Sequence, residues 1–426
     1  MIGVSGFPRI LRALSNPNYG IYTAGSSVSL IGSWMQRVAV GWLTWQLTES
    51  GFWLGVMAFA DLFPTVVVGP LAGALADRWD RLRVIKIGQA LAMVQSLLLF
   101  GFTVNGLMTV ELLLVLTLAL GIIAAVNQPA RLALIPELVP AQDLPAAIAI
   151  NSIIFNSARF VGPLVAGLMI VGFGVEGAFA ANALTFVLFQ IALARVRLTR
   201  PAAAVAAPQG GLMGGGLLGE VGAGLGYAAR HAGIAPLLLL LVVLCLCTRP
   251  FVELLPGFAA DVFGAGAGGL ALLTATVGIG ATAGGLWLAQ RDGQGGLTLV
   301  ALSSTLALGL ALLLFVATDS LYVAVPALAV AGFCMVVNGV GTQILLQLAV
   351  ESAMRGRVMS LYGLIFRGGP AVGALIMGAA SEAVGLRWPL AVGVLLALAA
   401  TGWIWTRRRR MTEALEGGKA APLAAD

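Results

Sequence analysis

The feature that most constrains this chain is a succession of long apolar segments separated by short polar breaks. A helix needs about 20 apolar residues to cross the hydrocarbon core of a bilayer. A membrane β-barrel would show alternation in segments of about 10 residues. Helices are the other structure that satisfies every backbone polar group in lipid. The segments therefore predict an all-α, polytopic membrane protein in contact with the lipid bilayer.

The composition supports this class, because too few charged residues are present to cover a water-facing surface. Of the 426 residues, 10% are charged and 59% are hydrophobic, against roughly 25% and 45–50% in soluble domains. The three cysteines and the single histidine form no metal-ligand spacing. No phosphate-binding GxxxxGK[ST] loop and no nucleophile with a base occurs. We expect no metal, no cofactor, no nucleic-acid partner and no enzymatic activity.

Polar, Gly and Pro clusters divide the apolar sequence into about twelve helices. Their approximate ranges are 18–48, 52–76, 84–105, 108–130, 145–172, 176–195, 234–262, 267–290, 297–318, 320–350, 356–384 and 386–406. The stretch 196–232 is rich in Gly, Ala and Pro and is the expected linker. The predicted organisation is an N-terminal six-helix bundle over 1–195, a cytoplasmic linker over 196–232, a C-terminal six-helix bundle over 233–406 and a cytoplasmic tail over 407–426.

The two halves resemble each other in sequence. Gly162 and Pro163 of the first half correspond to Gly369 and Pro370 of the second, about half the chain apart. A repeat with the same orientation in both halves implies two bundles related by a pseudo-two-fold axis along the membrane normal. Each Gly-Pro pair is expected to kink its helix, with small residues such as Gly167 allowing a neighbouring helix to approach.

The basic residues fix the expected orientation, because short positively charged loops remain in the cytoplasm. Of the 24 Lys and Arg, all but five fall on one side of the predicted spans. Arg387 lies on the other side and four arginines lie inside helices. The opposite loops carry acids, such as Glu49, Glu176 and Asp319. We expect both termini and the linker in the cytoplasm, and the chain as a multi-pass protein of a bacterial cytoplasmic (inner) membrane.

The stretch GPLAGALADRWDRLR, residues 69–83, combines a small-residue helix end with a dense group of charges. Asp77 comes at the C-terminal end of this helix. An acid there opposes the local dipole, unless an arginine or another helix N-terminus faces it. We expect this acid to contact the start of the helix near Gly356 when the cytoplasmic side is closed. The alternative is a charged loop that serves topology alone. The gating residues predicted here are Gly69, Gly73, Asp77, Arg78 and Arg81.

Six ionisable residues fall inside the predicted spans, where each isolated charge costs about 2.5–3.5 kcal/mol. We therefore expect them to pair or to line water. Arg37 and Asp61 lie at similar depth on adjacent helices and can pair. Arg249 and Glu253 lie one turn apart and are expected to face the same way. These four residues, with Arg159 and Arg367 before the two Gly-Pro pairs, are the candidates for proton coupling or substrate binding.

Two interpretations of these charges remain open. In the functional interpretation, Asp61 and Glu253 exchange protons, while the arginines adjust that exchange or hold an anionic substrate. In the structural interpretation, the charges form ion pairs that fix helix packing.

The sequence resembles the major facilitator superfamily in the stretch 69–83, where a glycine-rich helix end is followed by Asp-Arg and further arginines. The phrases SLIGSWMQRVAVGWLTWQLTES, NQPARLALIPELVP, RFVGPLVAG and RGRVMSLYGLIFRGGPAVGALIMG resemble the third drug:proton antiporter branch. That branch includes macrolide-efflux and enterobactin-exporter proteins. SARFVGPLVAG is similar to the helix 5 motif of superfamily antiporters, which the family links to export. The helix 4 motif with an intramembrane arginine before Gln-Gly is absent.

The resemblance implies a secondary active transporter. The leading hypothesis is proton-coupled efflux of a small amphipathic compound, drug-like or siderophore-like, by alternating access. Uptake or facilitated passage of a polar solute is the alternative within transport. A membrane scaffold or sensor without transport is the alternative outside it.

Overall fold

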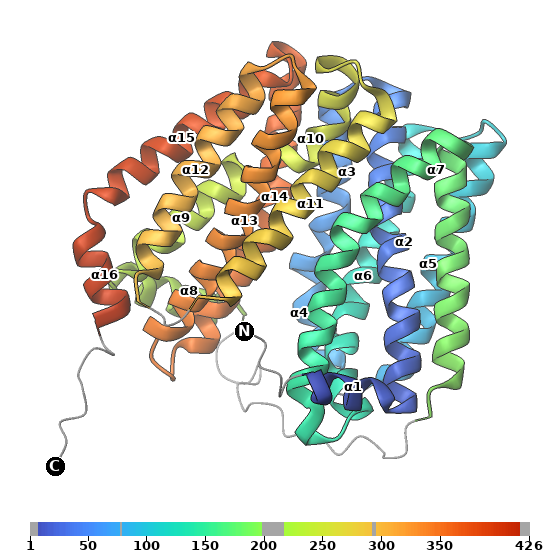
Figure 1. The fold of residues 1–426 in the computed structure, drawn as a ribbon, viewed down its shortest axis with the longest axis horizontal. Helices are drawn as coiled ribbons and strands as arrows, with labels where there is room; N and C mark the ends of the chain where they lie inside the picture. Colours follow the sequence, from blue (N-terminus) through green and yellow to red (C-terminus); the bar gives the residue numbers. More distant parts are fainter. Residues whose placement is uncertain (1–6, 77–78, 198–216, 292–294, 418–426) are drawn as a thin grey trace. The chain divides into compact units, whose positions relative to one another are not determined.

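The structure is a computed structural model that describes residues 7–76, 79–197, 217–291 and 295–417 (Figure 1). Every regular element in these ranges is a helix, and they contain no strand. The all-α prediction is therefore confirmed. The chain divides into two compact units, which are described separately. Unit 1 comprises residues 1–207 and 255–275, and unit 2 comprises 208–254 and 276–426.

Unit 1 contains most of the elements of the N-terminal half. Along α2 lies α7, and α5 packs against both α6 and α7. The second segment of unit 1 begins at Leu255, inside α10, and Pro250 directly precedes α10. The elements are α1 (Phe7–Ser15), α2 (Pro17–Thr48), α3 (Gly51–Leu62), α4 (Pro64–Ala76), α5 (Arg81–Val104), α6 (Val110–Leu138), η1 (Ala141–Asp143) and α7 (Leu144–Arg195).

Unit 2 contains the remaining elements except η2, which belongs to unit 1, and the boundaries between the units fall inside α10 and α11. Within unit 2, α12 packs along α13, and α9 packs against α14 and α15. The elements of the chain after residue 216 are α8 (Leu217–Arg230), α9 (Ile234–Cys247), α10 (Phe251–Gly257), the π-helix η2 (Phe258–Val262), α11 (Gly266–Ala289), α12 (Leu297–Ala317), α13 (Leu321–Ala349), α14 (Arg355–Val384), α15 (Arg387–Trp405) and α16 (Arg408–Glu416).

The long helix α7 supplies two membrane crossings, because its backbone turns at Gly174. That residue has φ 74° and ψ 176°, whereas the rest of α7 is helical. A positive φ of this kind is accessible to glycine at little cost. The turn separates two helical segments of α7, which correspond to the expected helices 145–172 and 176–195.

Prolines interrupt two of the expected spans at their charged residues. The span predicted for 52–76 divides at Phe63 into α3 and α4, and Pro64 begins α4. The span predicted for 234–262 divides at Thr248–Pro250 into α9 and α10. Proline lacks the N–H that would continue the helical ladder. Asp61 and Arg249 therefore lie beside local breaks in the helical backbone.

Ten segments of the described ranges are long and apolar enough to cross a membrane. Among them α7 counts once, although it turns at Gly174. Helix α2 is not among these ten segments, because Gln36, Arg37 and several serines lower its mean hydropathy. Its 32 residues still exceed the length that a membrane span needs. The twelve predicted crossings therefore each correspond to a helical segment, six from each half.

The structure differs from the expected boundaries in three places. Helix α6 continues to Leu138 through Pro129 and Pro136, two turns beyond the predicted end at residue 130. Arg131, expected in a loop, therefore lies inside this helix. The segment expected as a linker contains α8, and the expected tail contains α16. The division into halves at 196–232 stays a prediction.

Helix α16 is attached to the other helices of unit 2. The carboxylate of Glu416 accepts hydrogen bonds from the backbone N–H groups of Gly296, at 2.5 Å, and Thr298, at 2.7 Å. These groups form the N-terminus of α12, where unpaired N–H groups favour an anion. Met411 and Leu415 are buried beneath α16. The C-terminal helix is thus part of the folded unit.

Candidate functional site

The predicted pairing of charges inside the first half is present in the structure. Nη2 of Arg37 on α2 lies 3.4 Å from Oδ2 of Asp61 on α3. The two side chains are 30% and 25% exposed. Both side chains are therefore only partly buried by the protein. The depth argument from the sequence correctly placed the two residues side by side.

Trp34 is close to two arginines of unit 1. Its ring centroid is 5.5 Å from the guanidinium carbon of Arg37 and 5.7 Å from that of Arg159. Phe155 contacts the same ring edge-on, with centroids 6.2 Å apart. Cations over an indole face interact favourably with its quadrupole. The arrangement joins an aromatic surface to two positive charges and one carboxylate.

Glycine at position 162 allows α7 to approach Trp34. A Cβ atom built on Gly162 would lie 2.4 Å from the Cβ of Trp34, which is closer than side chains pack. Phe155, Arg159 and Gly162 are spaced by four and three residues and share one face of α7. This spacing explains why one helix presents an aromatic ring, a cation and a gap to the same tryptophan.

In unit 2, Arg249 has an aromatic partner. Its guanidinium carbon lies 4.2 Å from the ring centroid of Phe366 on α14, and Nη2 donates to the carbonyl of Met335 at 3.4 Å. Tyr362 stacks on Phe366 with centroids 5.4 Å apart, and its hydroxyl donates to the Gly339 carbonyl at 3.2 Å. Arg249 is thus held by a ring and a carbonyl.

Arg249 and Glu253 do not lie on one unbroken helix, and the expectation that they face the same way stays a prediction. Arg249 lies in the turn between α9 and α10, and Glu253 lies in the first turn of α10. Pro250 separates them, and the backbone N–H of Arg249 bonds to the Leu244 carbonyl. The i, i+4 rule applies within an unbroken helix and does not cross this turn.

Arg159 and Arg367 have different surroundings. Arg159 is half-buried and contacts Trp34, whereas the side chain of Arg367 on α14 is exposed. An arginine in the middle of a span is costly in hydrocarbon, so this face of α14 requires water or polar groups. Neither neighbouring proline breaks its helix, because α7 and α14 continue through Pro163 and Pro370.

Only part of the predicted gate lies within the described residues. Gly69 and Gly73 belong to α4, while Asp77 and Arg78 lie outside the described ranges. Arg81 at the start of α5 forms an ion pair with Glu137 and donates to the Ala133 carbonyl at 3.2 Å. Both partners belong to the extended end of α6. The contact expected between Asp77 and the start of α14 stays a prediction.

Comparison with known proteins places this arrangement in a family. The family model for transmembrane secretion effectors of the major facilitator superfamily matches residues 11–422. The chain belongs to this family of major facilitator transporters. The resemblance stated for residues 69–83 is therefore confirmed.

Several named relatives share the sequence over different lengths. The transporter is 24% identical to macrolide efflux protein A of Streptococcus pyogenes over 380 residues, 88% of this chain and 92% of the relative. It is 26% identical to the enterobactin exporter EntS of Escherichia coli over 389 residues, 87% and 89% of the two chains. The match to the staphyloferrin A transporter of Staphylococcus aureus, at 24% identity, spans only 39% of this chain and 42% of that protein.

A solved structure confirms the fold. A bacterial homologue of the human lysosomal transporter Spinster superposes with a TM-score of 0.71 at 13% identity, covering 94% of this transporter and 99% of that chain. At this identity the likeness concerns the fold alone.

A buried polar network in unit 1 was missed from the sequence. Gln36 on α2 donates to Gln95 on α5 at 2.9 Å and accepts from Asn182 on α7 at 2.6 Å. Gln95 donates onward to the Leu116 carbonyl at 3.1 Å. Hydrogen bonds of this kind hold membrane helices together. An amide gives no charge signal in a sequence, so only the three-dimensional contacts reveal this network.

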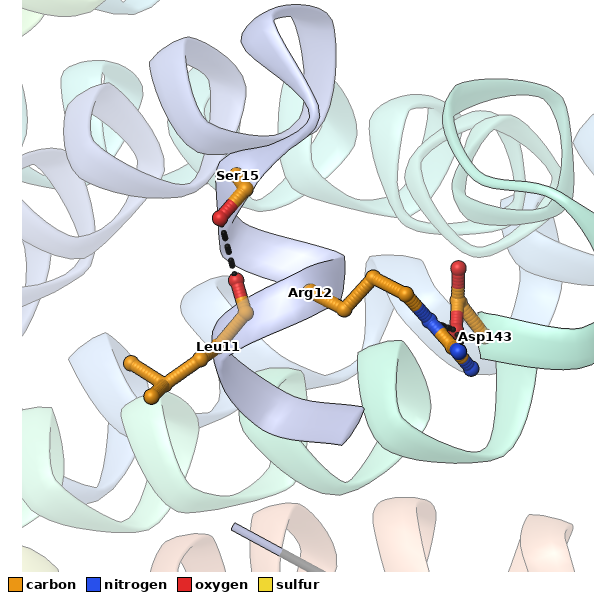
Figure 2. Close-up of polar contacts among 4 residues, drawn as sticks. All are labelled: Leu11, Arg12, Ser15 and Asp143. Atoms are coloured by element: carbon orange, nitrogen blue, oxygen red, sulfur yellow. Dashed lines mark hydrogen bonds and ion pairs between the residues drawn. The ribbon is translucent and has the colours of Figure 1, made fainter. Parts of the chain in front are cut away.

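Two further ion pairs of unit 1 also involve acids that the sequence left unassigned. Figure 2 shows Arg12 of α1 reaching Asp143, with Nη2 2.6 Å from Oδ1. Asp143 is buried and immediately precedes α7. Glu137, the partner of Arg81, lies in the last turn of α6, shortly before this connection. Within the described ranges, no group of three or more His, Cys, Asp or Glu is placed to hold a metal ion.

Proposed function

We propose that this transporter exports a small amphipathic compound in exchange for protons, by alternating access across a bacterial cytoplasmic membrane. The observation that carries the proposal is the accessible ion pair of Arg37 and Asp61 beside Trp34. An intramembrane carboxylate marks a proton or ion pathway. An aromatic ring between cations suits a compound with both apolar and polar parts.

Asp61 is the proposed coupling acid in this scheme. When it is ionised, it neutralises Arg37 at 3.4 Å. When it takes up a proton, the attraction to Arg37 is lost, and the guanidinium becomes available to a substrate acceptor. The same site can then hold either the proton or the substrate contact. Glu253 on α10 is the second candidate acid and is tested alongside it.

Export is the proposed direction for two reasons. The phrase SARFVGPLVAG resembles the helix 5 motif that antiporters of the superfamily carry. Two relatives that match along nearly all of the chain are named for efflux and export.

The excess of basic residues on one side supports cytoplasmic termini. Residues 69–83 act in this proposal as the cytoplasmic gate, with Asp77 facing the start of α14.

Transport by purified protein in proteoliposomes tests the function. Vesicles with an imposed pH gradient are supplied with a macrolide, enterobactin or staphyloferrin A. We expect gradient-driven accumulation of at least one compound, and its loss when the gradient is collapsed. If a compound equilibrates across the membrane without accumulating, whether or not a pH gradient is imposed, the result would favour facilitated passage. A complete lack of movement with all compounds, in protein that is folded, would favour a scaffold or sensor.

A further inference from the structure

An arginine inside α6 has hydrogen-bond donors with no partner. Nε and Nη2 of Arg131 are buried, and no group of the described residues accepts a hydrogen bond from either atom. The residue lies seven positions before the end of α6 at Leu138, or about 10 Å along the helix. Leaving a buried charged donor unsatisfied is costly. The position therefore requires an acceptor that the described residues do not supply.

The two unpartnered atoms define what kind of acceptor fits. Nε–H and Nη2–H point in the same direction from one edge of the planar guanidinium. This edge matches two oxygens of a carboxylate or a phosphate, which accept two parallel hydrogen bonds. We propose that Arg131 is the core of an oxyanion-binding site within unit 1, for a carboxylate or phosphate group from outside the protein. This site goes beyond the proposed export cycle, which does not use Arg131.

The surroundings hold the guanidinium in place. Its carbon lies 5.1 Å from the ring centroid of Phe189 on α7. Tyr22 on α2 contacts the same ring edge-on, with centroids 5.7 Å apart. Phe189 is fully buried. A cation stacked on a buried ring loses freedom before the ligand binds, so little further ordering is needed.

A buried amide and a residue that lines a narrow crevice lie one turn before and one turn after Arg131 on α6. Oδ1 of Asn127, one turn earlier on α6, is also buried without a partner. Its amide can present Nδ2 instead, because the two atoms exchange by a half turn. A narrow crevice between α2, α6 and α7 is lined by Tyr22 and by Ile135, one turn after Arg131. The remaining lining includes hydroxyl and amide groups of Tyr19, Thr23, Ser26 and Asn151.

Neighbouring arginines of unit 1 show that this arrangement is specific to Arg131. Arg12 has the carboxylate of Asp143, and Arg81 has that of Glu137. No carboxylate of the described residues forms an ion pair with Arg131. Glu137 lies on the same helix, but its partner is Arg81. Within the described ranges, acids are thus placed beside Arg12 and Arg81, whereas none is placed beside the fork of Arg131.

Thermal unfolding of the full chain in nanodiscs tests the site. In phosphatidylcholine discs, inorganic phosphate or succinate should raise the Tm of the wild type with increasing concentration. Arg131→Gln should need at least tenfold more of either ion for the same shift. Arg131→Lys, which keeps the charge but loses the fork, should also bind more weakly. Arg195→Gln, the same change at an exposed arginine of unit 1, should respond as the wild type does.

A second arm distinguishes a free oxyanion from a lipid headgroup. In discs with phosphatidylglycerol and no added ion, a headgroup in the site should raise the Tm of the wild type but not of Arg131→Gln, and added phosphate should then shift neither. Equal responses of Arg131→Gln and wild type to all probes would overturn the site, as would a wild type that responds to none. A phosphate response that appears only in Asp77→Asn would also overturn it, because Asp77 would then occupy the fork.

The ion-free Tm gives an independent readout. Removing an unpaired buried cation should leave Arg131→Gln as stable as the wild type or more so in ion-free phosphatidylcholine discs. A clearly lower Tm there would show that the protein already satisfies the guanidinium, and the proposal would fail.

Discussion

Arg37 in unit 1 and Arg249 in unit 2 are both arginines within predicted membrane spans, but different kinds of side chain lie beside them. Each is an arginine inside the first span of its half, about one half-chain apart in sequence. Arg37 is balanced by the carboxylate of Asp61 at 3.4 Å. Arg249 lies 4.2 Å from the ring centroid of Phe366. The first partner can take up a proton, whereas the second cannot.

This difference assigns distinct tasks to the two units. A carboxylate partner makes the charge balance around Arg37 depend on protonation. A ring partner stabilises Arg249 by a quadrupole that no proton changes. We therefore expect proton coupling to depend on the pair in unit 1, and a constant positive charge to persist in unit 2. The halves of a sequence repeat can thus differ in chemistry at equivalent positions.

The largest effect is expected from Asp61→Asn. This substitution removes the carboxylate that lies 3.4 Å from Arg37, so gradient-driven accumulation should fall at least tenfold while exchange down a substrate gradient persists. Proteoliposome transport with and without a pH gradient measures both. Glu253→Gln is the matched neutralisation in unit 2 and should retain accumulation. If Asp61→Asn accumulates substrate as the wild type does, the comparison between the units breaks.

A large effect on stability is expected from Gly162→Ala. The new methyl group would lie 2.4 Å from the Cβ of Trp34, and overpacking of this kind costs about 1–3 kcal/mol. Gly172→Ala on the same helix is the control, because no atom lies within 4 Å of a Cβ built there. Chemical denaturation in detergent compares the two. Equal stability of both variants would show that α7 does not need this gap beside Trp34.

A smaller effect is expected from Phe366→Leu in unit 2. Losing a cation–π contact costs about 0.5–2 kcal/mol, so transport should fall several-fold. The number of protons moved for each substrate should not change, because the ring carries no proton. Phe173→Leu, at a ring that is 68% exposed, should transport normally. A changed proton number in Phe366→Leu would contradict the distinction between the units.

The smallest effect is expected from Asp319→Asn. Asp319 pairs with Arg387, but its side chain is 83% exposed. Exposed ion pairs contribute about 0–1 kcal/mol, so the change in unfolding free energy should stay below about 0.5 kcal/mol. Thermal unfolding at low and high salt measures it. A loss as large as that of an intramembrane pair would show that exposure does not separate these two classes of ion pair.

Much of the fold follows from the sequence because each expected span is a long apolar run. The pairing of Arg37 with Asp61 was also predictable, since the depth of each residue can be counted from its helix end. Proline patterns were less informative. Pro129 and Pro136 suggested an early end of the helix, yet α6 continues through both. Packing against neighbouring helices tolerates proline inside a membrane helix.

The contacts of Arg249 and Arg131 could not be predicted from the sequence. Phe366 is more than a hundred positions from Arg249, and no charge pattern connects an arginine to a distant ring. Pro250 turned the backbone so that the regular helical spacing to Glu253 no longer applied. Arg131 was expected in a loop because the predicted helix ended at residue 130, whereas α6 continues to Leu138. In each case tertiary packing decided the surroundings of the side chain.

Proton movement during transport tests the central claim most directly. Proteoliposomes that contain a pH-sensitive dye receive a macrolide, enterobactin or staphyloferrin A, whichever the wild type moves, without an imposed pH gradient. The wild type and Glu253→Gln should move protons opposite to the substrate. Asp61→Asn should move the substrate with no accompanying change of internal pH. An Asp61→Asn variant that moves protons with the substrate as the wild type does would contradict the assignment of coupling to the Arg37 and Asp61 pair.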